Sequence, residues 1–492
     1  MKLDFAYPFS NRPVTDLLLL PLLQGQKPSS LEDSLQEEVE AVLKTEDFSG
    51  KVGQTLLFYP KGEKEKRVLL VGLGKEEALQ EESFRRSIGS AIRSCQKKKI
   101  NSVCLHLSSK LPFSSDRGLE LALEAIFFAN YHFTHSKNET LKESPIHLLE
   151  SVVAISKKKN FSKWVRIEKL TEALGLARNL VNRNADEVTP EELAKVALKL
   201  SKLSSKVSVK VLDKKELEKE KMGLLLAVGR SSRNTPKLII LSYKGNPKSS
   251  KKLALVGKGV TYDTGGLSLK PTPSMLTMRA DMGGAAAVLG TMLACILLDI
   301  PKNIVGVIPT TENSIDADSY KIGDVYTAYS GKTVEITNTD AEGRLILADA
   351  ISYTLDKIKP DAMVTLATLT GGVVVALGEE MTGSFSTSEK LQEMLKKASE
   401  KTGELIWPLP FYLPYKKMLA SEVADIKNSA GREASSIQGA LFLHAFVNKK
   451  IPFAHLDIAG TAFLSKAVGY HPAQATGMPV RLLVDLIETY TP

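Results

Sequence analysis

Cysteine is scarce in this chain of 492 residues, which carries only Cys95, Cys104 and Cys295. Three scattered thiols exclude the disulfide framework of a small secreted protein and a thiolate metal site. The seven histidines include no HExxH motif and no obvious ligand pair, which excludes the zinc site that this motif forms. Any metal must therefore be held mainly by carboxylates.

Long hydrophobic runs are also missing. The apolar stretch at residues 282–298 lies between Asp281 and Asp299 and is shorter than the roughly 20 residues that a membrane helix needs. The other candidate, residues 17–23, is interrupted by Pro21 and lacks the features of a signal peptide. We expect a buried helix from the first stretch, a strand from the second, no membrane association and a cytoplasmic protein.

The net charge of +9 comes from 65 basic and 56 acidic residues, with lysine clusters such as residues 97–99 and 251–252. Such clusters could bind nucleic acid, but no aromatic residues interleave with them and acidic residues share the cluster at 214–221. A solvated surface is the simpler interpretation. DNA binding stays open as a secondary role.

Two α/β domains are predicted, at residues 1–165 and 166–492. In the first, residues 67–74 and 102–107 have strand character and flank a helix that carries Phe84. In the second, Thr189-Pro190-Glu191 predicts a helix start, with a cap, a proline at the first position and an acid in the first turn. It precedes a series of strand-like segments separated by helical ones; the strand-like segments are residues 207–211, 238–243, 253–256, 304–309 and 363–367. This alternation predicts a mixed, mostly parallel sheet covered by helices on both faces.

The motif NTDAEGRL at residues 338–345 crowds two carboxylates and a guanidinium into five positions. It follows the strand-like residues 334–337 and leads into a helical pattern, and such strand-to-helix turns often carry the chemistry of α/β proteins. If the motif is extended, Asp340, Glu342 and Arg344 share one face. Two neighbouring carboxylates repel each other unless a cation lies between them. The alternative is a solvated turn with Asp340 as helix cap and Arg344 in a salt bridge.

A second charged cluster precedes this motif by about eighty residues. Lys258 and Asp263 lie among four glycines, just after the buried strand expected at 253–256, and Lys270 and Asp281 follow. Glycines at this density allow tight turns and a close approach of backbone to a ligand. Asp281 precedes a helix rich in small residues, so a helix cap is its alternative role.

Together these residues resemble the dinuclear metal site of the leucyl aminopeptidases, also called cytosol aminopeptidases. The flanking segments 177–182, 367–371, 457–461 and 475–477 are similar to this family too, whereas Tyr262, Thr264 and Arg279 depart from its usual Phe, Ser and Lys. The resemblance implies two divalent cations, Mn²⁺ or Zn²⁺. Their implied ligands are Lys258, Asp263, Asp281, Asp340 and Glu342.

The resemblance also implies the reaction. A water that bridges the metals attacks the first peptide bond, Lys270 stabilises the oxyanion, and a bicarbonate at Arg344 relays protons. The implied pocket for the first side chain, which favours leucine and other apolar residues, is formed by Met278, Asn338, Thr368, Leu369, Gly371, Ala459 and Ala462. For Met278 and the alanines, core packing is an alternative.

Similar proteins act on short peptides in intracellular turnover, assemble as hexamers, and in some cases bind DNA. A non-catalytic protein that uses metal only for stability is the remaining alternative. It is disfavoured because all seven key positions are present.

Overall fold

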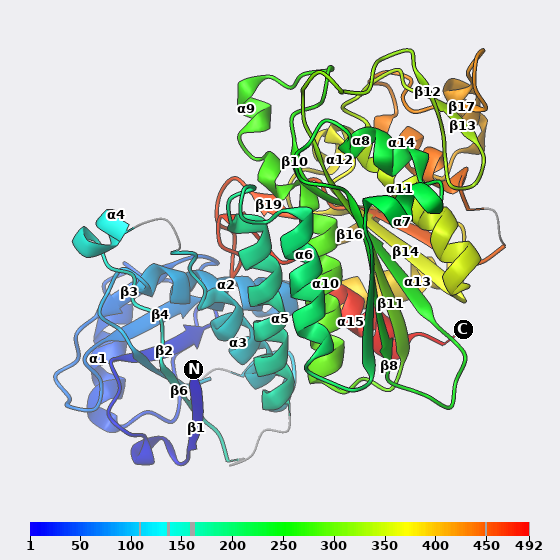
Figure 1. Ribbon diagram of the computed structural model, residues 1–492. Coiled ribbons are helices and arrows are strands. Elements are labelled where there is room, and N and C mark those ends of the chain that lie inside the picture. The colour runs from blue at the N-terminus through cyan, green and yellow to red at the C-terminus, as the bar shows by residue number, and fades with distance from the viewer. Residues whose placement is uncertain (108–109, 135–137, 158–162, 448–449, 492) are drawn as a thin grey trace. The chain divides into compact units, whose positions relative to one another are not determined.

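The computed structural model describes residues 1–107, 110–134, 138–157, 163–447 and 450–491. The chain forms two compact units (Figure 1). The first unit contains Met1–Thr171 and Lys466–Ala473, and the second contains Glu172–Ser465 and Gln474–Pro492. The chain divides between Thr171 and Glu172, inside helix α5 (Trp164–Asn182). The predicted boundary after residue 165, at the start of this helix, stays a proposal.

The first unit is built on a six-stranded sheet of order β1-β6-β5-β2-β4-β3, in which only β3 is antiparallel to its neighbour. Its strands are β1 (Lys2–Ala6), β2 (Leu17–Leu22), β3 (Thr55–Phe58), β4 (Val68–Gly72), β5 (Ser102–Leu105) and β6 (Ser151–Ile155). Its helices are η1 (Phe9–Asn11), α1 (Asp33–Leu43), η2 (Glu76–Ala78), α2 (Glu81–Cys95), α3 (Ser115–Ala129) and α4 (Asn138–Glu143). The strand predicted at residues 17–23 is confirmed as β2, which is buried along its whole length because it lies inside the sheet.

The second unit contains a nine-stranded mixed sheet of order β16-β15-β18-β14-β9-β11-β8-β7, with β10 paired to β11. Its strands are β7 (Val207–Leu212), β8 (Lys237–Lys244), β9 (Leu253–Gly257), β10 (Gly259–Asp263), β11 (Asn303–Asn313), β14 (Ala362–Ala367), β15 (Thr382–Ser386), β16 (Ile406–Pro408) and β18 (Phe453–Asp457). The central strands β11, β9, β14 and β18 are mutually parallel. Smaller sheets join β12 (Val325–Thr327), β13 (Thr333–Glu335) and β17 (Ile426–Lys427), and β19 (Phe463–Leu464) with β20 (Gln474–Ala475).

Helices cover both faces of this sheet. The helices of this unit, besides α5, are α6 (Pro190–Ser201), α7 (Lys214–Lys219), α8 (Gly223–Gly229), α9 (Thr272–Met275), η3 (Met278–Met282), α10 (Gly283–Leu297), α11 (Glu342–Tyr353), η4 (Thr354–Ile358), α12 (Gly371–Leu377), α13 (Glu389–Thr402), η5 (Leu413–Leu419), α14 (Ser435–His444) and α15 (Val480–Thr489). Ala254 and Val256 of β9 share a core cluster with Leu345 of α11. Since side chains alternate along a strand, the other face of β9 is left for α10, which also packs on this strand. The predicted mixed, mostly parallel sheet with two helical layers is confirmed.

Helix α10 is the buried helix predicted at residues 282–298, and Figure 1 shows it beside α6 along the sheet. The stretch Met278–Leu297 is long and apolar enough to cross a membrane, but 94% of its most apolar window is buried inside the protein. Glycines explain the close packing: a Cβ at Gly257 of β9 would lie 2.5 Å from the carbonyl oxygen of Gly284. The small residues of this helix therefore serve its approach to the sheet.

Candidate metal centre

Lys258 lies at the junction of β9 and β10, at the carboxyl end of the central sheet. Its backbone N–H donates to the carbonyl of Leu366 in β14 (2.9 Å), and its own carbonyl accepts from the N–H of Ala285 in α10 (2.8 Å). These two contacts fix the backbone between a neighbouring strand and the first turn of a helix. The side chain is only 3% exposed, so the ammonium must find its partners inside the protein.

The ammonium of Lys258 joins three distant segments. Its Nζ lies 2.7 Å from Oδ1 of Asp281 in η3 and 2.9 Å from Oε1 of Glu342 at the start of α11. It also donates to the carbonyl of Thr368 (2.9 Å), after β14. The stem packs against Gly343, where a Cβ would approach within 2.7 Å of Nζ. The glycine is therefore needed for Lys258 to reach Glu342.

Lys270 makes the second set of ion pairs. Its Nζ lies 2.9 Å from Oδ2 of Asp263, at the end of β10, and also pairs with Asp340. The loop that carries it is held by a hydrogen bond from its backbone N–H to the carbonyl of Thr264 (2.9 Å). The structure thus brings together the two lysines and four carboxylates of the two charged clusters that the sequence analysis singled out.

Burial and mutual repulsion dominate the electrostatics of these carboxylates. Burial, followed by the charge of Glu342, raises the pKa of Asp263 to about 7. Burial also raises the pKa of Asp281 and of Asp340 above the ordinary range, despite the nearby lysines. Burial acts the same way on Glu342, but there the attraction of Lys258 and Lys270 prevails and its pKa is lowered. The site holds more negative charge than two ammonium groups can balance.

The residues present fit divalent cations. Asp263, Asp340 and Glu342 each offer an oxygen, and these oxygens lie within 4.8 Å of one another. Oδ2 of Asp281 is buried and has no hydrogen-bond partner among the described residues. Clustered carboxylate oxygens with unused acceptor capacity are suitable ligands for hard cations. Added positive charge would also relieve the repulsion described above.

Three interpretations that the sequence left open do not hold: the extended geometry of residues 340–344, and the alternatives in which Asp340 or Asp281 caps a helix. Residues 340–344 are not extended, because α11 begins at Glu342, so this residue and Arg344 lie on the first helical turn. Asp340 is not the helix cap, since Ala341 occupies that position. Asp281 does not cap α10 either, because η3 runs on to Met282 and the carboxylate points at Lys258 instead. The side chains of Asp281 and Asp340 thus point into the site and do not cap helices.

Arg344 is buried and donates from Nη1 to the carbonyl of Asn428 (2.7 Å). It forms no ion pair with any residue that the structure describes, so the predicted alternative of a salt bridge does not hold. Burial lowers its pKa to about 10, and Glu342 and Asp457 only partly offset this. A buried guanidinium without a carboxylate partner keeps hydrogen-bonding capacity for an anion.

The residues predicted to line the substrate pocket fall into two groups. Oγ1 of Thr368 donates to Oδ1 of Asp281 (2.7 Å), and the backbone N–H groups of Leu369 and Ala459 donate to Oδ1 of Asp457 (3.1 and 3.3 Å). Ala462 and Thr368 both border Gly283, at the start of α10. These residues therefore meet beside the metal centre.

The other three predicted pocket residues lie in the loop before α11 and at the starts of η3 and α12. Oδ1 of Asn338 accepts from the N–H of Asp340 (2.8 Å), which shapes the ligand loop. Met278 opens η3, and Gly371 opens α12 with open space where a Cβ would stand.

Asn428 and Asp457 are among the buried polar residues at the site that the sequence analysis missed. Asn428 accepts at Oδ1 from the N–H of Thr337 (2.9 Å) and donates to the carbonyl of Asn338 (2.6 Å). Asp457, besides its contacts above, accepts from the hydroxyl of Thr370 (2.7 Å). Asn428 belongs to no motif, so nothing in its neighbourhood pointed to it. Asp457 opens the segment 457–461 that carries the family resemblance, which was a usable signal.

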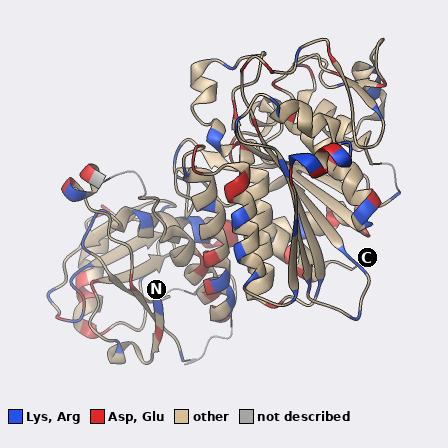
Figure 2. Ribbon diagram, in the orientation of Figure 1, with Lys and Arg blue, Asp and Glu red and all other residues tan. Residues whose placement is uncertain are grey.

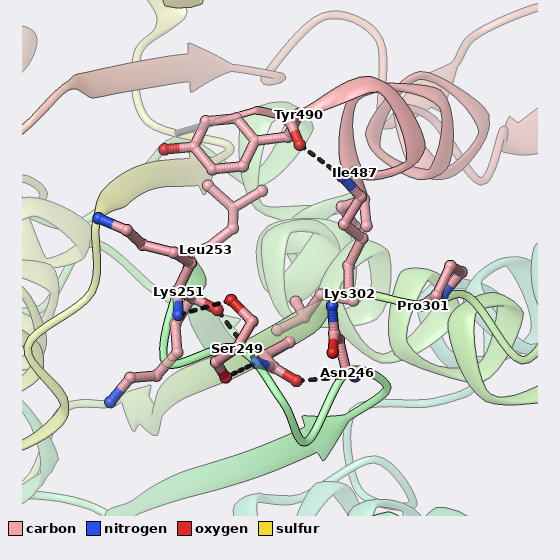
Figure 3. Close-up of a pocket in the computed structure, with 11 residues that line it drawn as sticks. Asn246, Ser249, Lys251, Leu253, Pro301, Lys302, Ile487 and Tyr490 are labelled. Carbon is pink, nitrogen blue, oxygen red and sulfur yellow. Dashed lines mark hydrogen bonds between the residues drawn. The ribbon is translucent and has the colours of Figure 1, made fainter.

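A separate small cavity lies at the opposite end of the strands. It has a volume of about 130 Å³ and is lined by the first residues of β9 and β11 together with Lys302 and Tyr490 (Figure 3). Nζ of Lys302 donates to the carbonyl of Tyr490 (2.7 Å). The carboxylates of the candidate centre all follow the carboxyl ends of these strands, so this cavity is not part of that centre.

Comparison with known proteins agrees with this geometry. Residues 175–484 match the catalytic domain of the cytosol aminopeptidase family, and residues 20–140 match the N-terminal domain of the same family. The probable cytosol aminopeptidase of Protochlamydia amoebophila is 42% identical over 492 residues, which cover 99% of each chain. That of Chlamydia felis is 43% identical, with 97% of each chain covered.

Solved structures give the same result. A mutant of tomato leucine aminopeptidase matches 100% of this chain and 97% of its own, with a TM-score of 0.88 and 31% identity. The bottromycin maturation enzyme BotP in complex with Mn matches 96% of this chain and 99% of its own, with a TM-score of 0.86 and 30% identity. Since both domains match along nearly their full length, this chain belongs to the cytosol aminopeptidase family, whose members are metal-dependent enzymes that hydrolyse peptides at the N-terminus.

Proposed function

We propose that this protein is a leucyl aminopeptidase that releases leucine and other apolar residues from the N-termini of short peptides during peptide turnover. The observation that carries the proposal is the buried cluster of four carboxylates with excess negative charge. It lies where the central parallel strands end, and a loop that follows β14 runs beside it. A metal site that served stability alone would not need a buried guanidinium that forms no ion pair with the described residues.

Lys258, Asp263, Asp281 and Glu342 would hold one divalent cation, and Asp263, Asp340 and Glu342 the other. This assignment follows the family resemblance, and the distances among the carboxylates support it. Two such cations, Mn²⁺ or Zn²⁺, would supply Lewis-acid activation of a water and of the scissile carbonyl. Lys258 must lose its proton to become a ligand. In the metal-free site the carboxylates keep its pKa above the ordinary value despite burial, so nearby cations are required to displace that proton.

Lys270 would stabilise the oxyanion that forms when the peptide carbonyl is attacked. Its ammonium lies in the centre, and its pKa is held above the ordinary value because the attraction of Asp263 and other carboxylates outweighs burial. It is therefore charged at neutral pH, as this role requires. Once cations neutralise the carboxylates, the ammonium is released from its ion pairs and becomes available to the substrate.

Arg344 would hold a bicarbonate that takes up a proton as general base. Its guanidinium is anchored by Asn428 and makes no ion pair with the described residues. Thr368, Leu369 and Ala459, which meet beside Asp281 and Asp457, would shape the pocket for the first side chain together with Met278, Asn338, Gly371 and Ala462. The short side chains of the two alanines leave room for an apolar substrate residue.

We further infer that the protein acts in the cytosol as a homohexamer. The names of its relatives support the compartment. Large apolar side chains exposed around the candidate centre support assembly. DNA binding as a secondary role rests on the net charge of +9 alone, and basic and acidic residues are interspersed on both units (Figure 2). Retention on DNA that weakens steeply with salt would be its signature.

Hydrolysis of leucine p-nitroanilide tests the activity. Metal-stripped protein should be inactive, addition of Mn²⁺ or Zn²⁺ should restore turnover, and the N-acetylated substrate should not be cleaved because a free α-amine is needed for binding. Cleavage without metal, or of the blocked substrate, would contradict the proposal. So would a folded protein with bound metal that cleaves neither substrate.

Substitution tests the site. Asp340→Ala removes one metal ligand and should abolish turnover, while the thermal unfolding temperature of the metal-free protein stays close to that of wild type. Asp340 lies on a half-buried loop, so its loss costs little packing. The exposed Asp318 provides the control, because Asp318→Ala also removes one negative charge and should leave turnover unchanged. Wild-type activity in Asp340→Ala would refute the assignment.

A further inference from the structure

Asn313 is a buried polar residue to which no role has been given so far. It is the last residue of β11, is 0% exposed, and pairs with Asp263 across the β10–β11 ladder. An amide in such a position costs free energy unless its hydrogen-bonding groups are used. Its surroundings are therefore informative.

The side-chain amide of Asn313 connects the two halves of the metal centre. Nδ2 donates to Oδ1 of Asp263 (2.8 Å) and to the carbonyl of Thr339 (3.0 Å), the residue before Asp340. Both partners are acceptors, which requires the NH₂ group and not the amide oxygen on this side. The backbone carbonyl of Asn313 also accepts from the N–H of Thr264 (3.0 Å). One residue thus holds the end of β10 and the loop before α11.

The two carboxylate oxygens of Asp263 have different partners. Oδ1 accepts from Asn313 and from the N–H of Gly265 (2.9 Å). Oδ2 faces the centre, where it lies 2.9 Å from Nζ of Lys270. With Oδ1 occupied by two N–H donors, Oδ2 is the oxygen left for a cation. These hydrogen bonds therefore fix the orientation of the Asp263 carboxylate in the metal-free protein.

Thr339 extends the same network. Its carbonyl accepts from the hydroxyl of the buried Tyr320 (2.7 Å), and its own hydroxyl donates to the carbonyl of Gly265 (2.6 Å). The N–H of Ser268 donates to that hydroxyl in turn (2.7 Å). These bonds join the loop after β10 to the loop that carries Asp340. Asn313 lies at the point where both loops meet the central sheet.

We propose that Asn313 is a positioning residue of the metal centre: it orients Asp263 and sets the spacing between Asp263 and Asp340, so that their oxygens are arranged for the cations. The inference rests on the proposed dinuclear site. Residues that hold metal ligands in place typically change metal affinity or activity 10–100-fold when substituted. Asn313 should act in this way because it contacts a ligand directly and the neighbour of another.

The test measures Mn²⁺ binding to metal-stripped protein by isothermal titration calorimetry, with thermal unfolding of the same metal-free samples. Asn313→Leu keeps a similar volume but has no donor, and Asn313→Asp keeps the shape but replaces both N–H donors with oxygen. Thr310→Val is the matched control. Thr310 lies on the same strand, is 0% exposed, and its hydroxyl has no hydrogen-bond partner among the described residues.

We expect Asn313→Leu to weaken Mn²⁺ binding roughly 10–100-fold, and Thr310→Val to leave it unchanged. Asn313→Asp should also weaken binding, although it adds negative charge near the site, because a second carboxylate would turn Asp263 away. A residue that contributed only to the local charge would instead strengthen Mn²⁺ binding when changed to Asp. The sign of the Asn313→Asp effect therefore separates positioning from electrostatics.

Wild-type affinity in both variants, or tighter binding by Asn313→Asp, would overturn the proposal. If Asn313→Leu does not fold, Asn313→Asp decides the question because it preserves the shape of the side chain. Mn²⁺ binding is read directly, so it is independent of peptide hydrolysis. A wild-type protein that binds Mn²⁺ and cleaves no substrate would refute the proposed activity and leave this test in force.

Discussion

At the scale of single residues, each lysine of the metal centre balances two carboxylates from different segments. Lys258 pairs with Asp281 and Glu342, and Lys270 pairs with Asp263 and Asp340. In the metal-free protein these ammonium groups partly take the place of cations. If cations bind as proposed, they would change the protonation of Lys258 and weaken the ion pairs of Lys270, so the stability of the protein should depend on both metal and pH.

The pKa of Asp263 predicts the direction of that dependence. Burial, followed by repulsion from Glu342, raises this pKa from the ordinary 3.8 to about 7 in the folded protein. Folding without metal thus binds a proton at this carboxyl group. The stabilisation is complete below pH 4 and is lost as pH rises through 7. We expect the free energy of unfolding of the metal-free protein to fall between pH 6 and pH 8, by on the order of 1 kcal/mol.

The comparison with Asp263→Asn isolates this effect, since that variant lacks the titrating group. The difference in unfolding free energy between wild type and variant should move against wild type as pH rises, in urea titrations at each pH. Added Mn²⁺ should restore wild-type stability at pH 8. A difference that stays constant or moves toward wild type would contradict the expected sign.

At the scale of the elements, glycines decide how closely helices approach the site. Gly343, on the first turn of α11, faces the stem of Lys258, and a Cβ there would lie 2.5 Å from Cε. This contact involves the flexible end of a side chain, in contrast to Gly284 of α10, where a Cβ would lie 2.2 Å from the backbone carbonyl of Leu366. Substitution at the first position should therefore displace a ligand, whereas substitution at the second should disturb the fold.

Gly343→Ala tests this distinction. The new methyl group should push the amine of Lys258 out of place, so that turnover and Mn²⁺ affinity fall roughly 10–100-fold while the protein stays folded. Gly175→Ala in α5 is the control, because a Cβ at this position meets no atom within 4 Å. It should keep full turnover and stabilise the protein by about 0.4–1 kcal/mol. Unchanged turnover and metal affinity in Gly343→Ala would show that Lys258 does not depend on the glycine.

At the scale of the whole molecule, exposed apolar side chains around the candidate centre favour assembly. Leu276, just after α9, is 74% exposed, and Val375 on α12 is 91% exposed. Leu269, next to Lys270, is 58% exposed. Burial of such side chains between subunits yields about 25 cal/mol for each Å² removed from water. Closed symmetric assembly is the common way to bury the same patch on every chain.

The exposed apolar side chains favour assembly without fixing the number of chains, and the family resemblance implies six. Light scattering coupled to size exclusion should then give the mass of six chains of 53.7 kDa. Assembly should persist at high salt, because the buried surface is apolar, not charged. An active species with the mass of one chain would contradict the proposed hexamer. It would leave the metal centre untouched, because all its described ligands come from one chain.

Much of the fold followed from local patterns. The apolar runs at residues 253–256 and 363–367 became β9 and β14, and Thr189 and Pro190 begin α6 as cap and first residue. An interpretation that used only the local alternation of side chains was less reliable. An extended conformation of residues 340–344 would have placed three charged side chains on one face, but the helical sequence that follows includes Glu342 and Arg344 in the first turn of α11.

The sequence by itself determined which residue types are available to the candidate site: few cysteines, no HExxH motif, two charged clusters, one of them rich in glycine, and the order of seven key residues. Only the tertiary structure decided which side chains support them. Asn313, Asn428 and Asp457 form hydrogen bonds to segments that are 26, 91 and 88 residues away in sequence. Such contacts leave no local pattern, because they arise only when parallel strands bring their carboxyl ends to one edge of the sheet.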